Sequence, residues 1–341
     1  MEDLLFSVIL PTYKRRELLR LVLEGLSDQS YPSFEVLAVV KSTNDGTENL
    51  IENYRAKLDI RLITQQAGYV TDALNLGMKN ARGNAFAFID DDAIPAPDWL
   101  ERHAETYEAL DVAGVAGDAI PSRLVNGKPK PSIETAKVPF SRFLSRLSYS
   151  TWEKPLPNTQ GYFIYVTCGG AVSLVGNYAY WRNRGMTVNS FLGMGANLTV
   201  LSKAIQSFSF DCSWISGSRW EQFLAWHIWR SGGRLVFNPT ATVFHISHGQ
   251  TLSRDLATKK AKLFQAENEL LFYRLCGKEK SLSHICHGIT VLHRIFAMLK
   301  NKDLQRLHGV IVGNLIGIRR LILRRARSDV LVLQDLQALQ G

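Results

Sequence analysis

The first third of the chain alternates short apolar runs with stretches whose apolar residues recur at helical spacing. The apolar runs predict strands at residues 6–10, 35–40, 60–64 and 85–89. The helical spacing predicts helices at residues 18–26, 47–58 and 72–80. Strands that alternate with helices in this way are typical of βαβ units and a mainly parallel sheet. Ligands of such sheets bind beyond the carboxyl ends of the strands.

Residues 119–189 interrupt this pattern and are predicted to form an irregular insertion. The segment contains six prolines and many aromatic residues. Two interpretations stay open: the insertion shapes a binding cleft, or it is a wrapped loop with a small core of its own. Regular signals return at residues 196–205. A helix is predicted at 219–229, and strand-like segments follow at 234–238 and 240–246.

The last 90 residues are predicted to be helical and carry all of the net charge. Helices are expected at 259–276, 284–299 and 304–327. Residues 252–341 contain 16 Lys and Arg against 7 Asp and Glu, whereas residues 1–251 contain 24 of each. An apolar stretch at 310–318 is followed by five arginines within residues 319–327. This pattern predicts peripheral membrane contact through residues 304–327. The alternative is a helix that packs on the rest of the protein and exposes a basic face.

Composition narrows the function classes. The chain has 341 residues, a formal net charge of +9 and 46% apolar residues, and it contains no apolar run of 18 residues. A transmembrane helix is therefore not expected, and the acidic start Met1-Glu2-Asp3 does not resemble a signal peptide. The four cysteines lack the spacing of a zinc site or a disulfide framework, which indicates reduced thiols and a cytoplasmic location. Because the basic excess is confined to one end, no nucleic-acid partner is expected.

Three consecutive aspartates, Asp90, Asp91 and Asp92, directly follow the predicted strand at 85–89. Because side chains alternate along an extended chain, Asp90 and Asp92 are expected on one side and Asp91 on the other. Paired carboxylates at a strand end suit Mg²⁺ or Mn²⁺. His245 ends a strand-like segment and is the candidate nitrogen ligand. The structural alternatives are a solvated acidic turn and a histidine of the core.

Several motifs in fixed order resemble those of the family 2 glycosyltransferases over about residues 5–275. The motifs are Val8-Ile-Leu-Pro-Thr-Tyr13 followed by Arg15; Asp45-Gly46-Thr47; Gly68, Ala73-Leu74-Asn75, Gly77 and Ala81-Arg82-Gly83; Phe88-Ile89-Asp90-Asp91-Asp92; Gly195-Ala196-Asn197-Leu198-Thr199; Phe210-Asp211; Trp220-Glu221; and Pro239-x-Ala241-x-Val243-x-His245. Each motif is weak by itself, but their order and spacing together are specific.

The resemblance implies an α/β protein of the GT-A fold, with a Rossmann-like, mainly parallel central sheet flanked by helices and a C-terminal helical extension. Residues 1–250 would form the catalytic domain, divided into a nucleotide-binding half (1–118), the insertion (119–189) and an acceptor and catalytic half (190–250). Residues 251–341 would form the basic helical region.

The resemblance also implies a function, that of an inverting glycosyltransferase. Such an enzyme moves a sugar from a UDP-, GDP- or dTDP-sugar to a hydroxyl acceptor in polysaccharide or glycolipid biosynthesis. The expected acceptor is lipid-linked, at the inner face of the cell membrane. Asp90, Asp92 and His245 would hold Mn²⁺ or Mg²⁺, and Glu221 would be the catalytic base. The residues expected to contact the nucleotide are Pro11, Thr12, Tyr13, Arg15, Asp45, Asn75, Asp90, Asp91 and Asn197.

Two departures from the family pattern affect these expectations. The family usually has an aspartate at the end of the second strand that recognises the base, and here that place holds Lys41. The base is therefore left open. In place of the usual Glu-Asp pair the chain has Trp220-Glu221, so that Glu221 stands where the aspartate would be. Two other functions are kept as alternatives: a sugar-phosphate nucleotidyltransferase, and a non-catalytic scaffold that binds lipid or polyanions through the basic tail.

Overall fold

The computed structural model describes residues 4–41, 44–132, 162–166, 172–173, 185–191, 193, 195–210 and 220–246, together with single helical positions between 288 and 315. The chain divides into two compact units. The first contains Met1–Thr135, Asn177–Cys212 and Trp220–Gly249, and the second contains Ala136–Gly176, Ser213–Arg219 and Gln250–Gly341. The site described below lies in the first unit.

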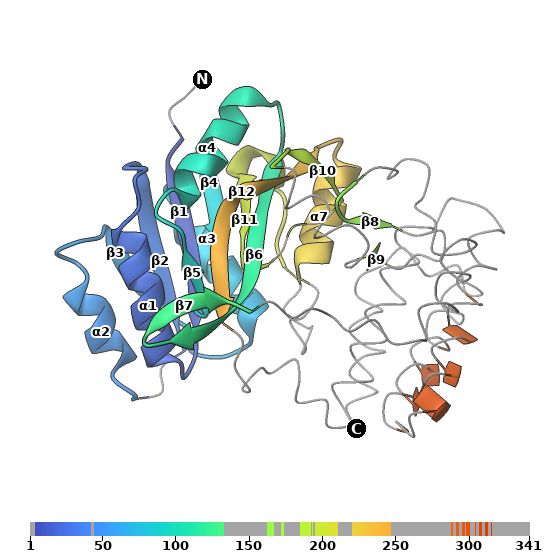
Figure 1. The fold of residues 1–341 in the computed structure, drawn as a ribbon, viewed down its shortest axis with the longest axis horizontal. Coiled ribbons are helices and arrows are strands. Elements are labelled where there is room, and N and C mark those ends of the chain that lie inside the picture. Colours follow the sequence, from blue (N-terminus) through green and yellow to red (C-terminus); the bar gives the residue numbers. More distant parts are fainter. Residues whose placement is uncertain are drawn as a thin grey trace. The chain divides into compact units, whose positions relative to one another are not determined.

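A ten-stranded sheet forms the centre of the first unit (Figure 1). Its main path follows the order β10-β12-β6-β11-β4-β1-β2-β3, while β5 pairs with β12 and β7 pairs with β6. The strands are β1 (Phe6–Thr12), β2 (Phe34–Val40), β3 (Ile60–Thr64), β4 (Ala85–Phe88), β5 (Ala93–Pro95), β6 (Gly114–Val125), β7 (Lys128–Pro131), β10 (Val188–Ser190), β11 (Leu198–Leu201) and β12 (Leu235–Ile246).

Parallel pairing links the four strands β4, β1, β2 and β3, as the alternating pattern predicted. β11 is antiparallel to both of its neighbours, β4 and β6, and β6 is parallel to β12. The carboxyl ends of β1, β2 and β4 therefore lie at one edge of the sheet. This is the edge at which ligands of parallel sheets bind.

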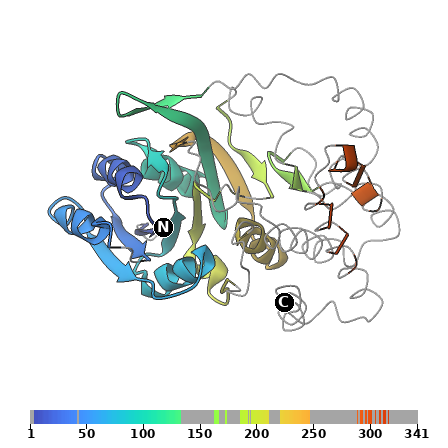
Figure 2. The ribbon, with the colours of Figure 1, turned by 90° about the horizontal axis from the view of Figure 1, so that it is seen from below.

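Helices cover both faces of the sheet. They are α1 (Arg16–Ser27), α2 (Thr47–Asn53), α3 (Val70–Asn80), α4 (Trp99–Ala109) and α7 (Trp220–Arg230), with a 3-10 turn at Ser202–Ile205. Figure 2 shows α1 and α4 on one face of the sheet and α3 and α7 on the other. Val8 and Leu10 of β1 belong to the same buried cluster as Leu19 and Leu23 of α1.

Ile9 points to the opposite face, toward α3. A Cβ atom on Gly77 would lie 2.5 Å from the Ile9 side chain, so this helix approaches β1 closely only because residue 77 is glycine. The period of two along β1 thus places one set of side chains under α1 and the other under α3.

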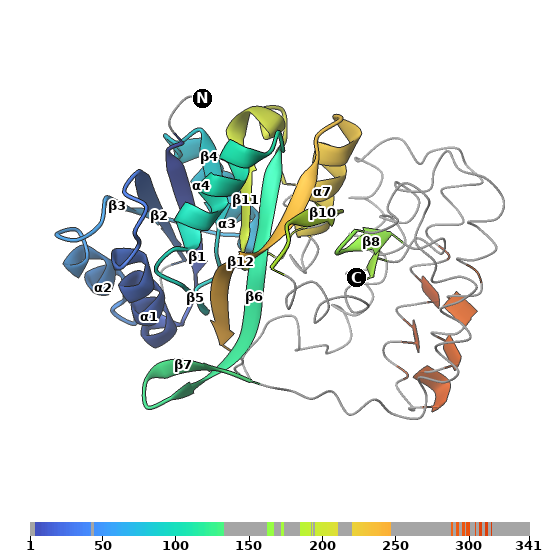
Figure 3. The same cartoon turned by 45° about the horizontal axis from the view of Figure 1, so that its top comes forward.

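Part of the predicted insertion is regular, which corrects the expectation for residues 119–189. Strand β6 runs to Val125 and turns through Asn126 and Gly127, both with positive φ, into β7. Figure 3 shows β6 beside β12 and continuing into this hairpin. The strand could not be predicted from local sequence because glycines and Pro121, which are rare in strands, occur within β6. Pairing with β11 and β12 stabilises it in the fold.

The other differences from the predicted elements are smaller. β5 and α4 were not predicted. Helix α2 ends at Asn53 rather than near residue 58, and the two segments predicted at 234–238 and 240–246 form one strand, β12.

The second unit is described only in part. It contains a short antiparallel pair, β8 (Tyr165–Val166) and β9 (Val172–Ser173). The predicted helix at 259–276 and the arginines of residues 319–327 lie outside the described residues. Within the described part of the chain, no helix combines the length and the apolar character needed to span a membrane.

Candidate active site

The three consecutive aspartates lie in a tight turn, not in the strand itself. β4 ends at Phe88, and the amide of Ala93 donates to the carbonyl oxygen of Asp90 across 3.1 Å. Asp91 and Asp92 are the two central residues of this turn. The prediction that Asp90 and Asp92 share one side is confirmed, but the turn, rather than strand alternation, places them there.

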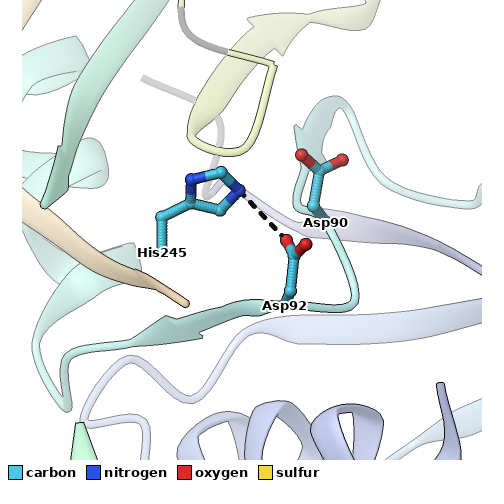
Figure 4. Close-up of side chains that lie close together, drawn as sticks. All are labelled: Asp90, Asp92 and His245. Atoms are coloured by element: carbon cyan, nitrogen blue, oxygen red, sulfur yellow. Dashed lines mark ion pairs between the residues drawn. The ribbon is translucent and has the colours of Figure 1, made fainter. Parts of the chain in front are cut away.

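Asp90, Asp92 and His245 lie close together (Figure 4). One ligand atom from each residue lies within 4.8 Å of the other two. The Nε2 atom of His245 is 3.1 Å from Oδ1 of Asp92. Asp92 is buried, while Asp90 and His245 are half-buried. The arrangement brings together the three residues that the sequence predicted as metal ligands.

A bulge in β12 directs His245 toward the two aspartates. The register between β12 and β6 shifts between Asn238 and Thr242. Before the bulge β12 pairs with β10, and after it β12 pairs with β5, which places His245 opposite Ala93. The amide of Ile246 then donates to the carbonyl oxygen of Asp92 across 2.8 Å. The strand contact therefore fixes both residues of the His245–Asp92 pair.

Asn197 holds the bulge from inside the protein. Its side chain is 0% exposed. Its Nδ2 donates to the carbonyl oxygens of Asp118 on β6 and Ala241 on β12, at 3.0 and 2.9 Å. Its Oδ1 accepts from Trp99 Nε1 at 2.8 Å and lies 3.0 Å from Nε2 of His103. This placement does not fit the expected contact with a nucleotide and instead makes Asn197 a positioning residue for β12.

Asp91 faces away from the candidate metal-ligand cluster, which consists of Asp90, Asp92 and His245, and contacts residues 12–15 at the end of β1. It accepts hydrogen bonds from Thr12 Oγ1 at 2.9 Å and from the backbone amide of Tyr13 at 3.4 Å. Nη1 of Arg15 donates to Asp91 Oδ1 at 2.7 Å and to Asp92 Oδ2 at 3.1 Å. Asp91 therefore connects residues 12–15 to the aspartate turn.

The electrostatics of the cluster reflect its burial and its crowded carboxylates. Removal from water, followed by the adjacent charge of Asp92, raises the pKa of Asp90 to about 7. The hydrogen bond with Asp92 raises the pKa of His245 despite partial burial. Burial lowers the pKa of Arg15, but the facing carboxylates raise it by more. The pKa of Arg15 therefore lies above its ordinary value, and the guanidinium stays charged. Two neighbouring carboxylates repel each other when both are ionised, and a bound cation would stabilise the doubly ionised pair.

The donor set fits a divalent cation. Ligands on opposite sides of a Mg²⁺ ion are about 4.2 Å apart, so small side-chain rotations would bring the three donor atoms to one ion. Carboxylate oxygens suit Mg²⁺ and Mn²⁺, and the imidazole nitrogen favours Mn²⁺. Asp92 can bind an ion through Oδ1 while its Oδ2 still accepts the hydrogen bond from Arg15.

Glu221, the predicted base, lies in the first turn of α7 and is half-buried. The preceding residue, Trp220, anchors this turn. Its ring lies 5.4 Å from that of Phe88 on β4 and 5.6 Å from that of Phe210. A Cβ atom on Gly195 would come within 2.8 Å of the Trp220 ring, so the glycine of the Gly-x-Asn motif makes room for it.

Asn75 supports the same region from α3. Its Nδ2 donates to the carbonyl oxygen of Phe210, and its Oδ1 accepts from the Phe210 amide, both at 2.8 Å. Asp45 is exposed and accepts from the Thr47 amide at 3.1 Å, at the start of α2. Pro11 lies in β1 opposite Val39. These contacts show how each residue is held within the protein. The nucleotide contacts of Pro11, Asp45 and Asn75 stay predictions.

Sequence reasoning missed two aromatic and basic features near this site. Lys41 was noted only as a departure from the family pattern, and Tyr69 was not noted at all. Tyr69 precedes α3, and its amide donates to Asp72 Oδ2 at 2.8 Å. The one signal in the sequence was Gly68, because a glycine directly before a predicted helix indicates a tight turn. In the structure Gly68 has a φ of +92°, which favours glycine.

Comparison with known proteins agrees with this geometry. Residues 7–170 match the sequence profile of Glycosyl transferase family 2. Over just under half of its length the chain is therefore similar in sequence to the family 2 glycosyltransferases. Among curated proteins, Glycosyltransferase AglE of Haloferax volcanii is 32% identical over 117 residues, which cover 33% of this chain and 38% of AglE. The chain thus matches less than half of the length of this relative.

Solved structures show the same fold at low identity. Staphylococcus aureus TarS 1–349, solved in complex with UDP-GlcNAc, has a TM-score of 0.51 and 16% identity, covering 92% of this chain and 89% of TarS 1–349. Mannosyltransferase PcManGT of Pyrobaculum calidifontis, in complex with GDP-Man and Mn²⁺, has a TM-score of 0.52 and 15% identity, covering 100% of this chain and 87% of PcManGT. These likenesses support the GT-A fold that the sequence predicted.

Proposed function

We propose that this protein is a family 2 glycosyltransferase, metal-dependent and inverting, that moves a sugar from a nucleoside diphosphate sugar to a hydroxyl acceptor. The observation that carries the proposal is the convergence of Asp90, Asp92 and His245 beyond the carboxyl ends of β4 and β1. TarS and PcManGT were solved with UDP-GlcNAc and with GDP-Man and Mn²⁺. These ligands support a nucleotide sugar and a divalent ion as partners here.

The residues of the cluster have separate roles in this proposal. Asp90, Asp92 and His245 hold Mn²⁺ or Mg²⁺. When bound, the ion would stabilise the negative charge that develops on the leaving nucleoside diphosphate. Arg15, which donates to Asp91 and Asp92, keeps the aspartate turn and residues 12–15 in one arrangement.

Glu221 is proposed to take the proton of the acceptor hydroxyl as that oxygen attacks the anomeric carbon. The bond between the sugar and the diphosphate breaks in the same step, so the nucleoside diphosphate leaves with the bonding electrons. Direct attack with one base inverts the configuration at the anomeric carbon. The first turn of α7, anchored by Trp220 on β4, supports this role because it lies in the same unit as the metal-ligand cluster.

The acceptor is proposed to be a lipid-linked precursor of a polysaccharide or glycolipid, reached at the cytoplasmic face of the membrane. Support comes from the basic C-terminal region and from exposed apolar side chains at its described helical positions. Their exposure ranges from 42% to 69%, and they are Leu292, Phe296, Leu299, Leu304, Ile311 and Leu315. An apolar helix surface beside basic residues is typical of peripheral membrane contact.

The experiment that tests the enzymatic proposal is hydrolysis of UDP- and GDP-sugars by the purified protein with Mn²⁺, in the absence of acceptor. We expect slow release of the nucleoside diphosphate, which EDTA abolishes and Mn²⁺ restores. Asp92→Asn should abolish the release, while Asp111→Asn, an exposed aspartate of the same unit, should not.

The alternatives give different products. A nucleotidyltransferase would release pyrophosphate from a nucleoside triphosphate and a sugar phosphate, and a scaffold protein would release nothing. Either result, with no nucleoside diphosphate from any donor, would contradict the proposal.

A further inference from the structure

Lys41 lies between two exposed tyrosine rings. Its Nζ atom is 5.6 Å from the ring centre of Tyr13 and 5.8 Å from that of Tyr69. The same atom donates a hydrogen bond to the carbonyl oxygen of Gly68 at 2.9 Å. The two tyrosines are 40% and 45% exposed, so each presents part of its ring to solvent. A cation near two aromatic rings is held by both of them.

The fold builds this arrangement from three segments. Tyr13 and Lys41 follow β1 and β2, whose last residues Thr12 and Val40 are paired in the parallel ladder. The Lys41 amide continues the ladder with a hydrogen bond to the Thr12 carbonyl oxygen at 3.2 Å. Gly68 has a positive φ, and a Cβ atom there would overlap the Asp72 carboxylate. The carbonyl group that holds Lys41 is therefore fixed by a position that only glycine fits.

This group is connected to the aspartate turn that carries two of the candidate metal ligands. The backbone amide of Tyr13 donates to Asp91, which lies between Asp90 and Asp92 in that turn, at 3.4 Å. A diphosphate bound at Asp90 and Asp92 would thus have Tyr13 and Lys41 at its side, on the carboxyl edge of β1 and β2. Exposed aromatic rings at such a place suit stacking with a nucleobase, whose face stacks on aromatic side chains.

The chemistry of the ammonium group limits which base it recognises. Lysine has three N–H donors and no acceptor. One donor is used by the Gly68 carbonyl oxygen, which leaves two. Cytosine presents two neighbouring acceptors, N3 and O2, and guanine presents O6 and N7. Uracil instead places an N3–H donor between its two carbonyl oxygens, and adenine pairs the N7 acceptor with an amino donor.

We propose that Lys41, flanked by Tyr13 and Tyr69, selects the nucleotide by donating hydrogen bonds to two neighbouring acceptors on its base, as cytosine and guanine offer them. This inference rests on the proposed function, because it assumes that a nucleoside diphosphate occupies the site. It assigns the residue that departs from the family pattern to donor specificity. A carboxylate at the same place would accept the N3–H of uracil, which an ammonium group cannot do.

The test measures binding of CDP, UDP, GDP and ADP to the full-length protein by calorimetry with Mn²⁺. We expect CDP to bind about tenfold more tightly than UDP, and GDP about tenfold more tightly than ADP, since a mispaired donor leaves a hydrogen bond unmade. Lys41→Met keeps the apolar stem and should bring both ratios close to one. Lys41→Asp should reverse the CDP to UDP ratio.

Two control variants separate base recognition from general charge. Lys14→Met removes a cation whose Nζ lies 5.3 Å from the ring of the same Tyr13. Lys57→Met removes an exposed cation 5.9 Å from the ring of Tyr54. Both should leave the ratios unchanged. Thermal melting of each variant checks that it is folded.

The outcomes distinguish this inference from the proposed function. A preference in either pair that Lys41→Met removes supports base selection by Lys41. Equal binding within both pairs, or a uniform loss of affinity for all four nucleotides in Lys41→Met and Lys14→Met alike, overturns it and leaves the proposed function intact. If the wild-type protein binds none of the four, the proposed function fails and the inference fails with it.

Discussion

The imidazole of His245 faces the carboxylate of Asp92, with 3.1 Å between Nε2 and Oδ1. The two residues are distant in sequence, and the antiparallel pairing of β5 with β12 brings them together. The pair is fixed by backbone hydrogen bonds, not by a flexible loop, so its geometry is available before any ligand arrives. Preorganisation of this kind favours tight binding of an ion.

His245→Ala is therefore expected to weaken Mn²⁺ binding by about 10²-fold, because one of the three proposed protein ligands is lost. The measurement is metal-dependent quenching of tryptophan fluorescence, followed by turnover at saturating Mn²⁺. His308→Ala, at an exposed helical position of the second unit, is the control. Unchanged Mn²⁺ affinity in His245→Ala would remove His245 from the metal site.

Glu221→Gln is expected to lower turnover by roughly 10² or more while nucleotide-sugar affinity stays close to that of the wild type. The substitution keeps the shape of the side chain and removes the proton acceptor. The measurement is steady-state transfer together with direct binding of the donor. Glu108→Gln, an exposed glutamate on α4, is the matched control.

Near wild-type turnover in Glu221→Gln would exclude Glu221 as the base. Asp211 would then be the next candidate from the sequence, although it lies outside the described residues.

The parallel half of the sheet could be predicted from sequence because each strand and helix there has a local apolar period. β1, β2, β3 and β4 with α1 and α3 follow that period. α4 could not be predicted in this way because its buried face includes the polar residues His103 and Thr106, which break the apolar period. Those residues are buried only because Asn197, Thr199 and Asn238 supply hydrogen bonds from other elements.

The candidate site was predicted in part for a similar reason. Asp90, Asp92 and His245 could be selected because their chemistry is distinctive and their motifs occur in order. The structural contacts of Asn75 and Asn197 could not be read from sequence. Their partners, the backbone of Phe210 and of Ala241, lie far along the chain, so no local pattern shows that these side chains hold a neighbouring backbone.

Burial of His103 predicts a pH-dependent loss of stability. Removal from water lowers the pKa of His103 to about 4, and its ring lies between Asn197 and Thr199. Because Asn197 uses its Nδ2 to donate to two carbonyl groups, its Oδ1 must accept from His103 Nε2. With a pKa of about 4 the ring is neutral at pH 7, and its one proton is on Nε2. The folded pKa is below that of the unfolded chain, so stability is complete above about pH 6.5 and falls as the pH drops toward 4.

The expected loss from His103 between pH 6.5 and 4 is about 3 kcal/mol, from a pKa difference of about 2.5. Denaturant unfolding of the wild type and of His103→Gln at both pH values isolates it, since all other groups titrate in both proteins. The variant should lose less stability than the wild type over this range. An equal loss in the two proteins would show that His103 does not titrate on unfolding.

The last prediction concerns the C-terminal region. Leu304, Ile311 and Leu315 occupy exposed helical positions, and the arginines of residues 319–327 follow in the sequence. Near an anionic leaflet each basic residue contributes about 1 kcal/mol, and buried apolar side chains add to this. The triple change Leu304→Ser, Ile311→Ser and Leu315→Ser is expected to lower partitioning onto anionic vesicles by about tenfold or more. High salt should lower it in the unchanged protein, because salt screens the basic residues. Met186→Ser, at an exposed position of the first unit, should have no effect.

Equal vesicle binding by the triple variant and the wild type would reject membrane contact through this region. A lower melting temperature without any change in vesicle binding would instead favour a helix that packs on protein.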